Sequence, residues 1–404
     1  MPFEASDLYD LDAELSDAAR ALRDRVRTWV DERFLPNVQT WWREGTFPLA
    51  LAGEMAALGC FGGTIKGYGC AGYSPLEYGI VMRELERGDS GLRTMASVQG
   101  ALAMHAIADF GSEAQKQQWL PALAQAQKLA CFGLTEPDFG SNPGGMATTA
   151  RRTATGWVLD GSKRWIGNAG VADVAIIWAR VVGDPSIDST SPKAIRGFLV
   201  DTRLPGYQAT LIDGKLSLRA ALTYEIALAG CEVPDDALLP GSRGLGSALS
   251  CLNHARYSIA WGVVGSAMAC FDEARQHAAS RVQFGRPIGA FQLVQARLAR
   301  MLSEITKAQL VAWRLAALKS EGRVTPAQIS LAKWSNVESA IEVAREARDL
   351  LGGVGILDSH QSFRHMCNLE SVRTYEGTMN MHMLVLGREI TGRSAFSPED
   401  LAMP

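Results

Sequence analysis

The chain has 404 residues, of which 47% are hydrophobic and 21% are charged, so it can form two or three domains with a large buried core. Forty basic and 43 acidic residues give a formal net charge of −3 without any basic block, which argues against a nucleic-acid partner. Seven scattered cysteines lack a CxxC pair and favour a reducing compartment. Six scattered histidines without an HExxH motif indicate no metal site.

The N-terminus and the apolar stretches bear on localisation. Residues 1–17 are acidic and resemble neither a secretory signal nor an Arg-rich transit peptide. The most apolar stretch, residues 172–182, is interrupted by charge and is shorter than the roughly 20 residues that a bilayer requires. We therefore expect a soluble, cytoplasmic protein with no membrane insertion.

The first third of the chain has helical periodicity. One apolar stripe recurs every three or four positions and is formed by Leu15, Ala18, Leu22, Val26 and Trp29. Similar patterns cover residues 76–86 and 99–110, and Ser112 predicts the N-cap of a further helix that follows the stop at Gly111. We predict an N-terminal helical domain over residues 1–130.

Residues 131–240 have the pattern of a small β domain, in which β-branched and aromatic residues alternate with turn residues. Asp160-Gly161 is typical of a two-residue turn and predicts a hairpin within residues 157–167. Further strands are expected over residues 172–182, 195–201 and 224–234.

Helical periodicity returns in residues 241–404. A narrow seam predicts one long bundle helix and consists of Val294, Leu298, Met301, Ile305, Ala308, Ala312 and Leu315. Thr325 to Gln328 form a capping box, and the helix that it opens is expected to end near Leu351, before Gly352 and Gly353. The fold class is therefore α+β, with helical, β and helical domains in this order.

Three stretches could carry chemistry, and each also has an ordinary structural explanation. Residues 131–145 form a glycine-rich stretch whose hydroxyls on Thr135 and Ser141 could bind a polar ring or a phosphate, or it is a plain inter-domain loop. In residues 163–168, Trp165 offers a flat face, or it is a core tryptophan at a strand end.

The third stretch combines Gly352-Gly353 with the segment Arg373–Thr378. The glycine pair could receive a phosphate or simply end a helix. Glu376 precedes Gly377, which leaves room for a ligand, but a solvated loop acid is an equal explanation. Glu136 and Glu389 are rival acids that the sequence alone does not rank.

Five motifs in this order resemble those of the acyl-CoA dehydrogenase family over about residues 15–396: LTEP followed by GS, RWIGN, RVQFGRPIGAFQLVQ, LLGGVGI and TYEGT. The resemblance implies an N-terminal helical domain, a β-barrel-like middle domain and a C-terminal four-helix bundle. It also implies that FAD is the cofactor and that the α,β-carbons of an acyl-CoA thioester are oxidised. In that family a base removes the α-proton while a hydride passes from the β-carbon to flavin N5.

The resemblance assigns roles to individual residues. Glu376 matches the base and Gly377 leaves space for the thioester, whereas Ala255 stands where some relatives carry the base on an earlier helix. The residues that match FAD contacts are Phe132, Leu134, Thr135, Ser141, Trp165, Ile166, Gly167, Gly352, Gly353 and Thr378. Those that match contacts to the FAD of a neighbouring subunit, and so imply a homotetramer, are Arg281, Phe284 and Gln292. The substrate-side matches are Ser141, Leu252, Asn253 and Arg256.

Residues 84–100 and 251–265 are similar to the glutaryl-CoA dehydrogenases of this family. The similarity implies that Arg93 and Ser97 hold the distal carboxylate of a dicarboxylic substrate, with Thr94 and Glu86 nearby. A substrate carboxylate would satisfy a buried arginine, although a structural ion pair of Arg93 with Glu86 or Asp89 is the alternative. Tyr375 is similar to the type that releases CO2 and leaves crotonyl-CoA.

One departure concerns Gly167, where the family usually has threonine. Residues 67–74 and 163–168 also look similar to short-chain acyl-CoA oxidases, which pass electrons to O2. An electron-transfer flavoprotein is the expected acceptor and oxygen is the second candidate, so a short-chain acyl-CoA oxidase or dehydrogenase is the alternative function. A flavin-binding relative that binds nucleic acid is disfavoured by the net charge and by the intact Glu376.

Overall fold

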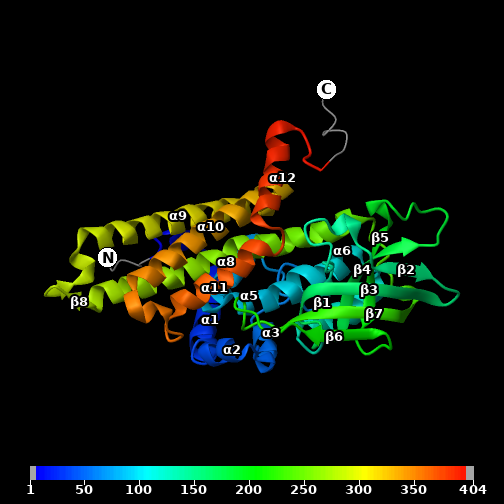
Figure 1. Ribbon diagram of the computed structural model, residues 1–404, viewed down its shortest axis with the longest axis horizontal. Helices are drawn as coiled ribbons and strands as arrows, with labels where there is room; N and C mark the ends of the chain where they lie inside the picture. Colours follow the sequence, from blue (N-terminus) through cyan, green and yellow to red (C-terminus); the bar gives the residue numbers. More distant parts are fainter. Residues whose placement is uncertain (1–5, 397–404) are drawn as a thin grey trace.

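The computed structural model describes residues 6–396. Its elements follow the expected order: helices, a β-sheet, then long helices (Figure 1). The N-terminal helices are α1 (Asp17–Trp29), α2 (Val38–Glu44), α3 (Ala52–Ala57), α4 (Pro75–Gly88), α5 (Ser90–Ala96), α6 (His105–Phe110) and α7 (Glu113–Ala124). A π-helical stretch, Ser97–Met104, joins α5 to α6, and Ser112 caps α7 in a capping box with Gln115, which confirms the expected helix start.

The predicted stripe of α1 is correct except at Ala18. Leu15, Leu22, Val26 and Trp29 are buried, but Ala18 is exposed and its neighbour Ala19 is buried instead. The reason is that Ser16 caps the helix, so Leu15 precedes it and the helical spacing is counted from Ala19 onward.

A twisted seven-stranded sheet follows, with strand order β1-β4-β2-β3-β7-β6 and with β5 paired to β4. The strands are β1 (Ala130–Gly133), β2 (Thr149–Arg152), β3 (Gly156–Gly167), β4 (Val174–Val182), β5 (Ile195–Asp201), β6 (Tyr207–Leu211) and β7 (Thr223–Pro234). Its own apolar core includes Trp157, Ile177 and Phe198. The strands expected over residues 172–182, 195–201 and 224–234 correspond to β4, β5 and β7.

The hairpin predicted at Asp160-Gly161 is wrong. These residues lie inside the single strand β3, where the register against β7 shifts between Leu159 and Gly161. Gly161 has φ +142°, and a Cβ there would lie 2.6 Å from the Thr148 hydroxyl. The conformational freedom of glycine therefore accommodates a bulge within a strand and not a turn between two strands.

The C-terminal helices are α8 (Leu245–Ser280), α9 (Gln292–Ser320), α10 (Pro326–Leu350), α11 (Gln361–Thr374) and α12 (Met379–Thr391), with a small ribbon of β8 (Val282–Gln283) and β9 (Arg286–Pro287) between α8 and α9. Figure 1 shows α8, α9 and α10 running side by side, while α12 projects away from them. The predicted seam is confirmed because Met301, Ile305 and Leu315 are buried. The predicted capping box at Thr325 is present as well.

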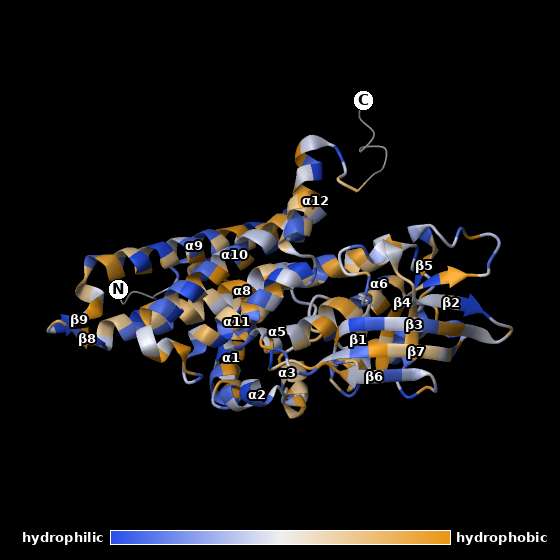
Figure 2. Ribbon diagram, viewed as in Figure 1, coloured by the Kyte–Doolittle hydropathy of each residue, from blue (hydrophilic) through white to orange (hydrophobic). Residues whose placement is uncertain are grey.

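The projecting α12 carries apolar residues to its surface. Met383, Leu384 and Ile390 are exposed, and Figure 2 shows hydrophobic colour on this helix. Within residues 6–396 we find no helix with the length and the apolarity that crossing a bilayer requires.

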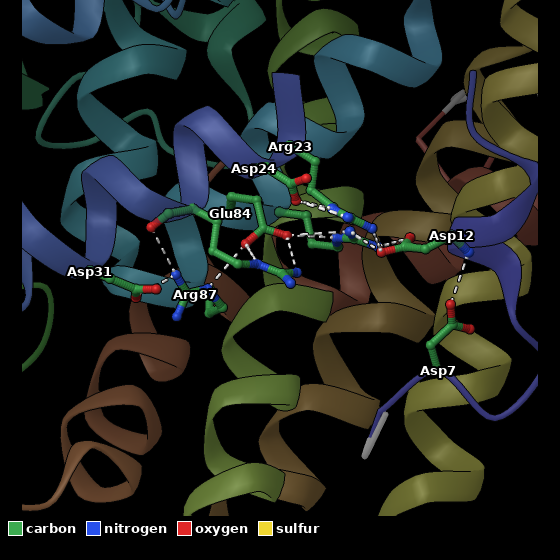
Figure 3. Close-up of polar contacts among 9 residues, drawn as sticks. Asp7, Asp12, Arg23, Asp24, Asp31, Glu84 and Arg87 are labelled. Atoms are coloured by element: carbon green, nitrogen blue, oxygen red, sulfur yellow. Dashed lines mark hydrogen bonds and ion pairs between the residues drawn. The ribbon is translucent and has the colours of Figure 1, made fainter. Parts of the chain in front are cut away.

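A charged network fixes α4 against α1 (Figure 3). The fully buried Glu84 carboxylate accepts hydrogen bonds from Arg27 at 2.9 and 3.0 Å and from Arg87 at 3.1 Å. The Arg83 guanidinium bridges Glu84 to Asp12. Burial opposes ionisation of Glu84, but Arg83, Arg27 and Arg87 outweigh it and lower its pKa to about 2.

Candidate active site

The segment that joins α11 to α12 has an unusual backbone. Glu376 adopts φ +59° and Gly377 adopts φ +97°, so two successive residues lie in the left-handed region. Thr378 then begins α12, because its side chain accepts a hydrogen bond from the Met381 N–H at 3.3 Å. The tight reversal therefore leaves Glu376 at the tip of a turn that residues 373–378 form.

Two cations hold the carbonyl groups of this turn. The Arg256 Nε, on α8, donates to the Glu376 carbonyl at 2.8 Å. The Lys333 Nζ, on α10, donates to the carbonyls of Tyr375 at 3.1 Å and Gly377 at 3.0 Å. Arg256 lies 120 residues from its partner in the sequence, and Lys333 lies 42 and 44 residues from its partners. Two helices distant in sequence thus fix one short turn.

The Glu376 carboxyl has one oxygen without a partner and a raised pKa. The residue keeps some exposed surface, but its Oε2 is buried and has no hydrogen-bond partner among the described residues. Burial raises the pKa of Glu376 to about 7, although Arg256, Arg93 and Lys333 oppose the increase. A free carboxyl oxygen with a pKa near neutrality is what a general base requires.

The rival acids lack this geometry. Glu136 accepts hydrogen bonds from the backbone N–H groups of Ala147 and Thr148 and from Lys163 at 2.8 Å, so its oxygens are already in use. Glu389 is exposed on α12. Ala255 is fully buried and supplies no acid.

Arg93 lies beside this turn in a second polar group. Its Nε donates to the Glu86 carboxylate at 2.7 Å and its Nη2 donates to the Tyr375 hydroxyl, while Nη1 makes no hydrogen bond within residues 6–396. Both Arg93 and Glu86 are buried, and Ser90 donates a further hydrogen bond to Glu86 at 2.8 Å. Gly262 on α8 permits this pair, since a Cβ there would lie 2.1 Å from a Glu86 oxygen.

The structure therefore decides which partner Arg93 has in the protein. Asp89, one of the two partners considered from the sequence, binds Arg364 at 3.0 Å and Asn368 at 2.8 Å instead. Arg93 is therefore not an unpaired buried charge, because Glu86 pairs with it, and its contact with a substrate carboxylate remains a prediction.

The other expected substrate residues surround these two groups. Ser97 lies 3.1 Å, oxygen to oxygen, from Ser258, and Thr94 lies next to the Tyr375 phenol. The Asn253 side chain accepts a hydrogen bond from Arg256 at 3.3 Å. Leu252 is half-buried, whereas Ser141 is exposed in the loop after β1.

The flavin-binding residues expected from the sequence divide into buried and exposed groups. Phe132, Leu134 and Ile166 are buried, and the Thr135 carbonyl accepts a hydrogen bond from the Arg164 N–H at 2.8 Å. Trp165 is 56% exposed with φ +63°, so the alternative of a core tryptophan is wrong. An indole held outward in a strained conformation offers an aromatic face to a planar ligand.

Gly167 ends β3 beside the π-helical stretch. A Cβ at this position would lie 3.1 Å from a Val98 methyl group. A threonine would press against Val98, so the glycine and the valine fit one another.

The remaining expected cofactor residues present open surface. Gly352 has φ +64°, and a Cβ added to it or to Gly353 would meet no heavy atom within 4 Å, which leaves room for a phosphate to approach the backbone. Phe284 is 93% exposed on the β8–β9 ribbon, and Arg281 and Gln292 nearby are exposed as well. An aromatic face, open glycines and exposed polar groups fit a flavin dinucleotide.

Two residues that the sequence analysis did not single out join the site. Lys333 is 1% exposed and His382 is 1% exposed, and the His382 Nε2 would lie 3.1 Å from a Cβ at Gly377. Burial, Lys333 and Arg256 lower the pKa of His382 to about 3, so this ring is neutral. A signal for Lys333 exists in the sequence, because it lies on the apolar stripe of α10 with Ile329 and Ala340.

One group among the described residues has metal-ligand composition: His105, Asp109 and His254. The two imidazole rings stack at 3.7 Å with an interplanar angle of 14°. A metal ion lies close to the plane of each imidazole that binds it, and two rings stacked face to face do not direct their nitrogen lone pairs at one point. This arrangement therefore does not favour metal binding.

Family models agree with this geometry along nearly the whole chain. Residues 16–127 match the N-terminal domain of acyl-CoA dehydrogenases, residues 131–231 the middle domain and residues 242–391 the C-terminal domain. The chain belongs to the acyl-CoA dehydrogenase family. It is therefore an oxidoreductase with the α+β architecture that the sequence predicts.

Individual relatives within the family refine this picture. Two crystal structures of glutaryl-CoA dehydrogenases from Mycobacterium smegmatis, the second in complex with FADH2, superpose on this chain with TM-scores of 0.93. They are 48% and 46% identical to it, and each comparison covers 97% of this chain and 99% of the other. The glutaryl-CoA dehydrogenase of Desulfococcus multivorans is 34% identical over 95% of this chain and 98% of its own. The human mitochondrial short-chain specific acyl-CoA dehydrogenase is 32% identical over 92% of this chain and 90% of its own.

Proposed function

We propose that the protein uses FAD to oxidise the α,β-carbons of glutaryl-CoA, with Glu376 as the base. The free, buried Oε2 of Glu376 is the observation that carries this proposal. The Mycobacterium relatives support glutaryl-CoA as the substrate. FAD, when bound, supplies the two-electron acceptor.

The protein's own residues account for the proton. The ionised Glu376 takes the α-proton, the β-carbon loses a hydride, and a double bond forms between the two carbons. Arg256, Arg93 and Lys333 favour the ionised carboxylate before this step, and burial favours the protonated carboxyl after it. These opposing effects hold the pKa of Glu376 at about 7, a value at which the residue can both accept and return a proton.

Decarboxylation is part of the same proposal, and the polar groups around Arg93 support it. The free Nη1 of Arg93, together with the hydroxyls of Tyr375, Thr94 and Ser97, forms a polar end for the acyl chain. Once the α,β double bond exists, the bond between the γ-carbon and the distal carboxyl breaks and CO2 leaves. The electron pair of the broken bond is delocalised from the γ-carbon into the conjugated thioester. Glu376 then returns its proton to the γ-carbon, which gives crotonyl-CoA.

Turnover of glutaryl-CoA and butyryl-CoA tests the proposal. We expect glutaryl-CoA to bleach the flavin anaerobically with kcat/KM at least about tenfold above that of butyryl-CoA, since one good charged contact contributes more than about 1.4 kcal/mol. Mass analysis should detect crotonyl-CoA. A preference for butyryl-CoA would exclude the role of Arg93, and a glutaconyl-CoA product would exclude decarboxylation.

A second candidate exists for the electron acceptor. It is supported by Gly167, which stands where the family usually has threonine and fits against Val98. An electron-transfer flavoprotein is the favoured acceptor, and an oxidase that uses O2 is the alternative. In air, the oxidase should form peroxide without any dye acceptor. Gly167→Thr combined with Val98→Ala, which makes space for the new side chain, should suppress that peroxide, with Val98→Ala alone as the control.

The assembly and the protein partner are also proposals. Phe284, Arg281 and Gln292 present exposed groups that support FAD sharing between subunits of a homotetramer. Aromatic residues are enriched in protein interfaces, so the exposed Phe284 supports an interface at this ribbon.

A further inference from the structure

Lys333 is a buried cation with no carboxylate hydrogen-bonded to it among the described residues. Its side chain is 1% exposed on α10. The Nζ donates to the carbonyls of Gly377 at 3.0 Å, Tyr375 at 3.1 Å and Arg373 at 3.5 Å. An ammonium has three N–H donors, so all three are directed at one turn.

The turn requires such support. A non-glycine residue in the left-handed region costs about 1–2 kcal/mol, and Glu376 adopts φ +59°. Lys333 binds the carbonyls on both sides of Glu376, and Arg256 binds the carbonyl of Glu376 itself. With these carbonyls held, the Glu376 side chain stays at the tip of the turn, where its Oε2 is free.

A helix-capping role alone does not explain Lys333. Lysines often bind the last carbonyls of a helix, and Arg373 belongs to the last turn of α11. The shorter bonds, however, go to Tyr375 and Gly377, beyond the helix. Burying a charge without an ionic partner is costly, so the position needs a compensating benefit.

We propose that Lys333 is a positioning residue for Glu376, holding the turn from both sides and supplying the positive charge that keeps the carboxylate ionised before proton abstraction. The inference rests on the proposed role of Glu376 as the base. The charged and titratable groups that face Lys333 are Glu376 and Arg373 from the turn, Arg256 from α8, Arg93 from α5, Glu338 from α10 and His382 from α12.

The pKa directions agree with this geometry. Burial lowers the pKa of Lys333 to about 7, and Glu376 opposes the decrease. Lys333 in turn lowers the pKa of Glu376, which burial raises. Each group therefore favours the charged form of the other.

The test compares Lys333→Met with Lys333→Arg in the holoenzyme. We expect Lys333→Met to move the midpoint of the pH profile for anaerobic flavin reduction upward by about one unit, because a cation near the base is lost. Lys333→Arg keeps the charge and should keep the midpoint near that of the native protein. Lys319→Met is the matched control, since Lys319 is a lysine of α9 that lies over the Tyr257 ring and makes no hydrogen bond to the turn.

A second readout does not depend on turnover. Replacing Glu376 by Gln removes a buried acid with a raised pKa. The Tm of Glu376→Gln should therefore exceed that of the native protein by an amount that grows as pH rises from about 4.5 and is constant above the folded-state pKa. In the Lys333→Met background this gain should level off at a higher pH. Lys333→Gln, also uncharged, should give the same displacement if the methionine variant does not fold.

The outcomes separate the two proposals. An unchanged profile and an unchanged melting midpoint in Lys333→Met would overturn the role of Lys333 and leave Glu376 as the base. Full flavin reduction in Glu376→Gln would instead overturn the proposed function, while the melting data would still report whether Lys333 acts on Glu376.

Discussion

Glu376 is subject to two opposing electrostatic effects. Burial penalises its charged form, while Arg256, Arg93 and Lys333 favour that form, and the resulting pKa is about 7. A base is most effective when its pKa lies near the working pH, because it is then both sufficiently ionised and sufficiently basic. If Glu376 is the base, as proposed, loss of any of the three cations should change the pH dependence of the reaction.

Arg256 provides a direct prediction at this scale. The rate of flavin reduction at limiting substrate, which reports kcat/KM, should rise with pH through about 7, as Glu376 of the free enzyme loses its proton. Arg256→Gln should move this midpoint upward, because the lost cation favoured the charged carboxylate. Rapid-reaction measurement of the flavin absorbance across pH gives the midpoint.

The exposed Arg323 gives the control. Arg323→Gln should leave the midpoint where it is. A midpoint that stays fixed or falls in Arg256→Gln would contradict the electrostatic account of the base.

Residues differ in how far the sequence alone can assign them. Glu376 is singled out by the resemblance of its segment to a distinctive family motif, and its role as the base remains a prediction. Lys333 has only its place on the apolar stripe of α10 as a signal, because a lysine in a helix normally faces water and its contact with the turn arises from the packing of α10. For Arg93 the sequence narrows the protein partner to Glu86 or Asp89, and only the packing of α4 on α8 selects Glu86.

Helices and strands are predicted well where the sequence has a periodic pattern, and poorly where pairing between strands determines their bounds. The seam of α9 and the cap of α10 depend on local spacing, and both are confirmed. The turn expected at Asp160-Gly161 depends on local propensity, but pairing of β3 with both β2 and β7 extends the strand through it. Long-range pairing of this kind has no local signature.

The contact between α1 and α4 yields a prediction about stability. Glu84→Gln should lower the free energy of unfolding by about 3–5 kcal/mol, since it leaves buried arginines without their carboxylate. The lowered pKa of Glu84 means that its contribution is complete above about pH 4.5 and is lost as pH falls through about 2. Denaturant unfolding at several pH values measures both effects.

Asp24→Asn is a suitable comparison, because Asp24 pairs with Arg23 at an exposed position. It should cost well under about 1 kcal/mol. Equal losses in the two variants would contradict the claim that burial gives Glu84 its importance.

At the scale of the whole molecule, the predicted order of helical, β and helical parts is correct, whereas the domain boundaries at residues 130 and 240 remain predictions. The proposed assembly would account for the exposure of apolar residues such as Phe284. Phe284 is 93% exposed on a ribbon far along the chain from the flavin loop, and only family resemblance assigns it a role.

Phe284→Ala tests that role. We expect this variant to lose FAD on dilution and to shift towards smaller species, because an aromatic anchor at an interface often contributes about 2 kcal/mol or more. Flavin absorbance per chain and light scattering measure the two effects. Leu216 is a second exposed apolar residue, at 80% exposure, and Leu216→Ala should change neither the FAD content nor the size of the assembly. Unchanged FAD content in Phe284→Ala would contradict cofactor sharing.

Replacement of Glu376 is the most direct test of the account. With FAD bound in equal amounts, anaerobic bleaching by glutaryl-CoA should be about 10²–10⁴-fold slower in Glu376→Gln than in the native protein, since loss of a general base costs that much. Glu389→Gln, at the exposed rival acid on α12, should bleach at the native rate. Bleaching of Glu376→Gln at the native rate would contradict the assignment of the base.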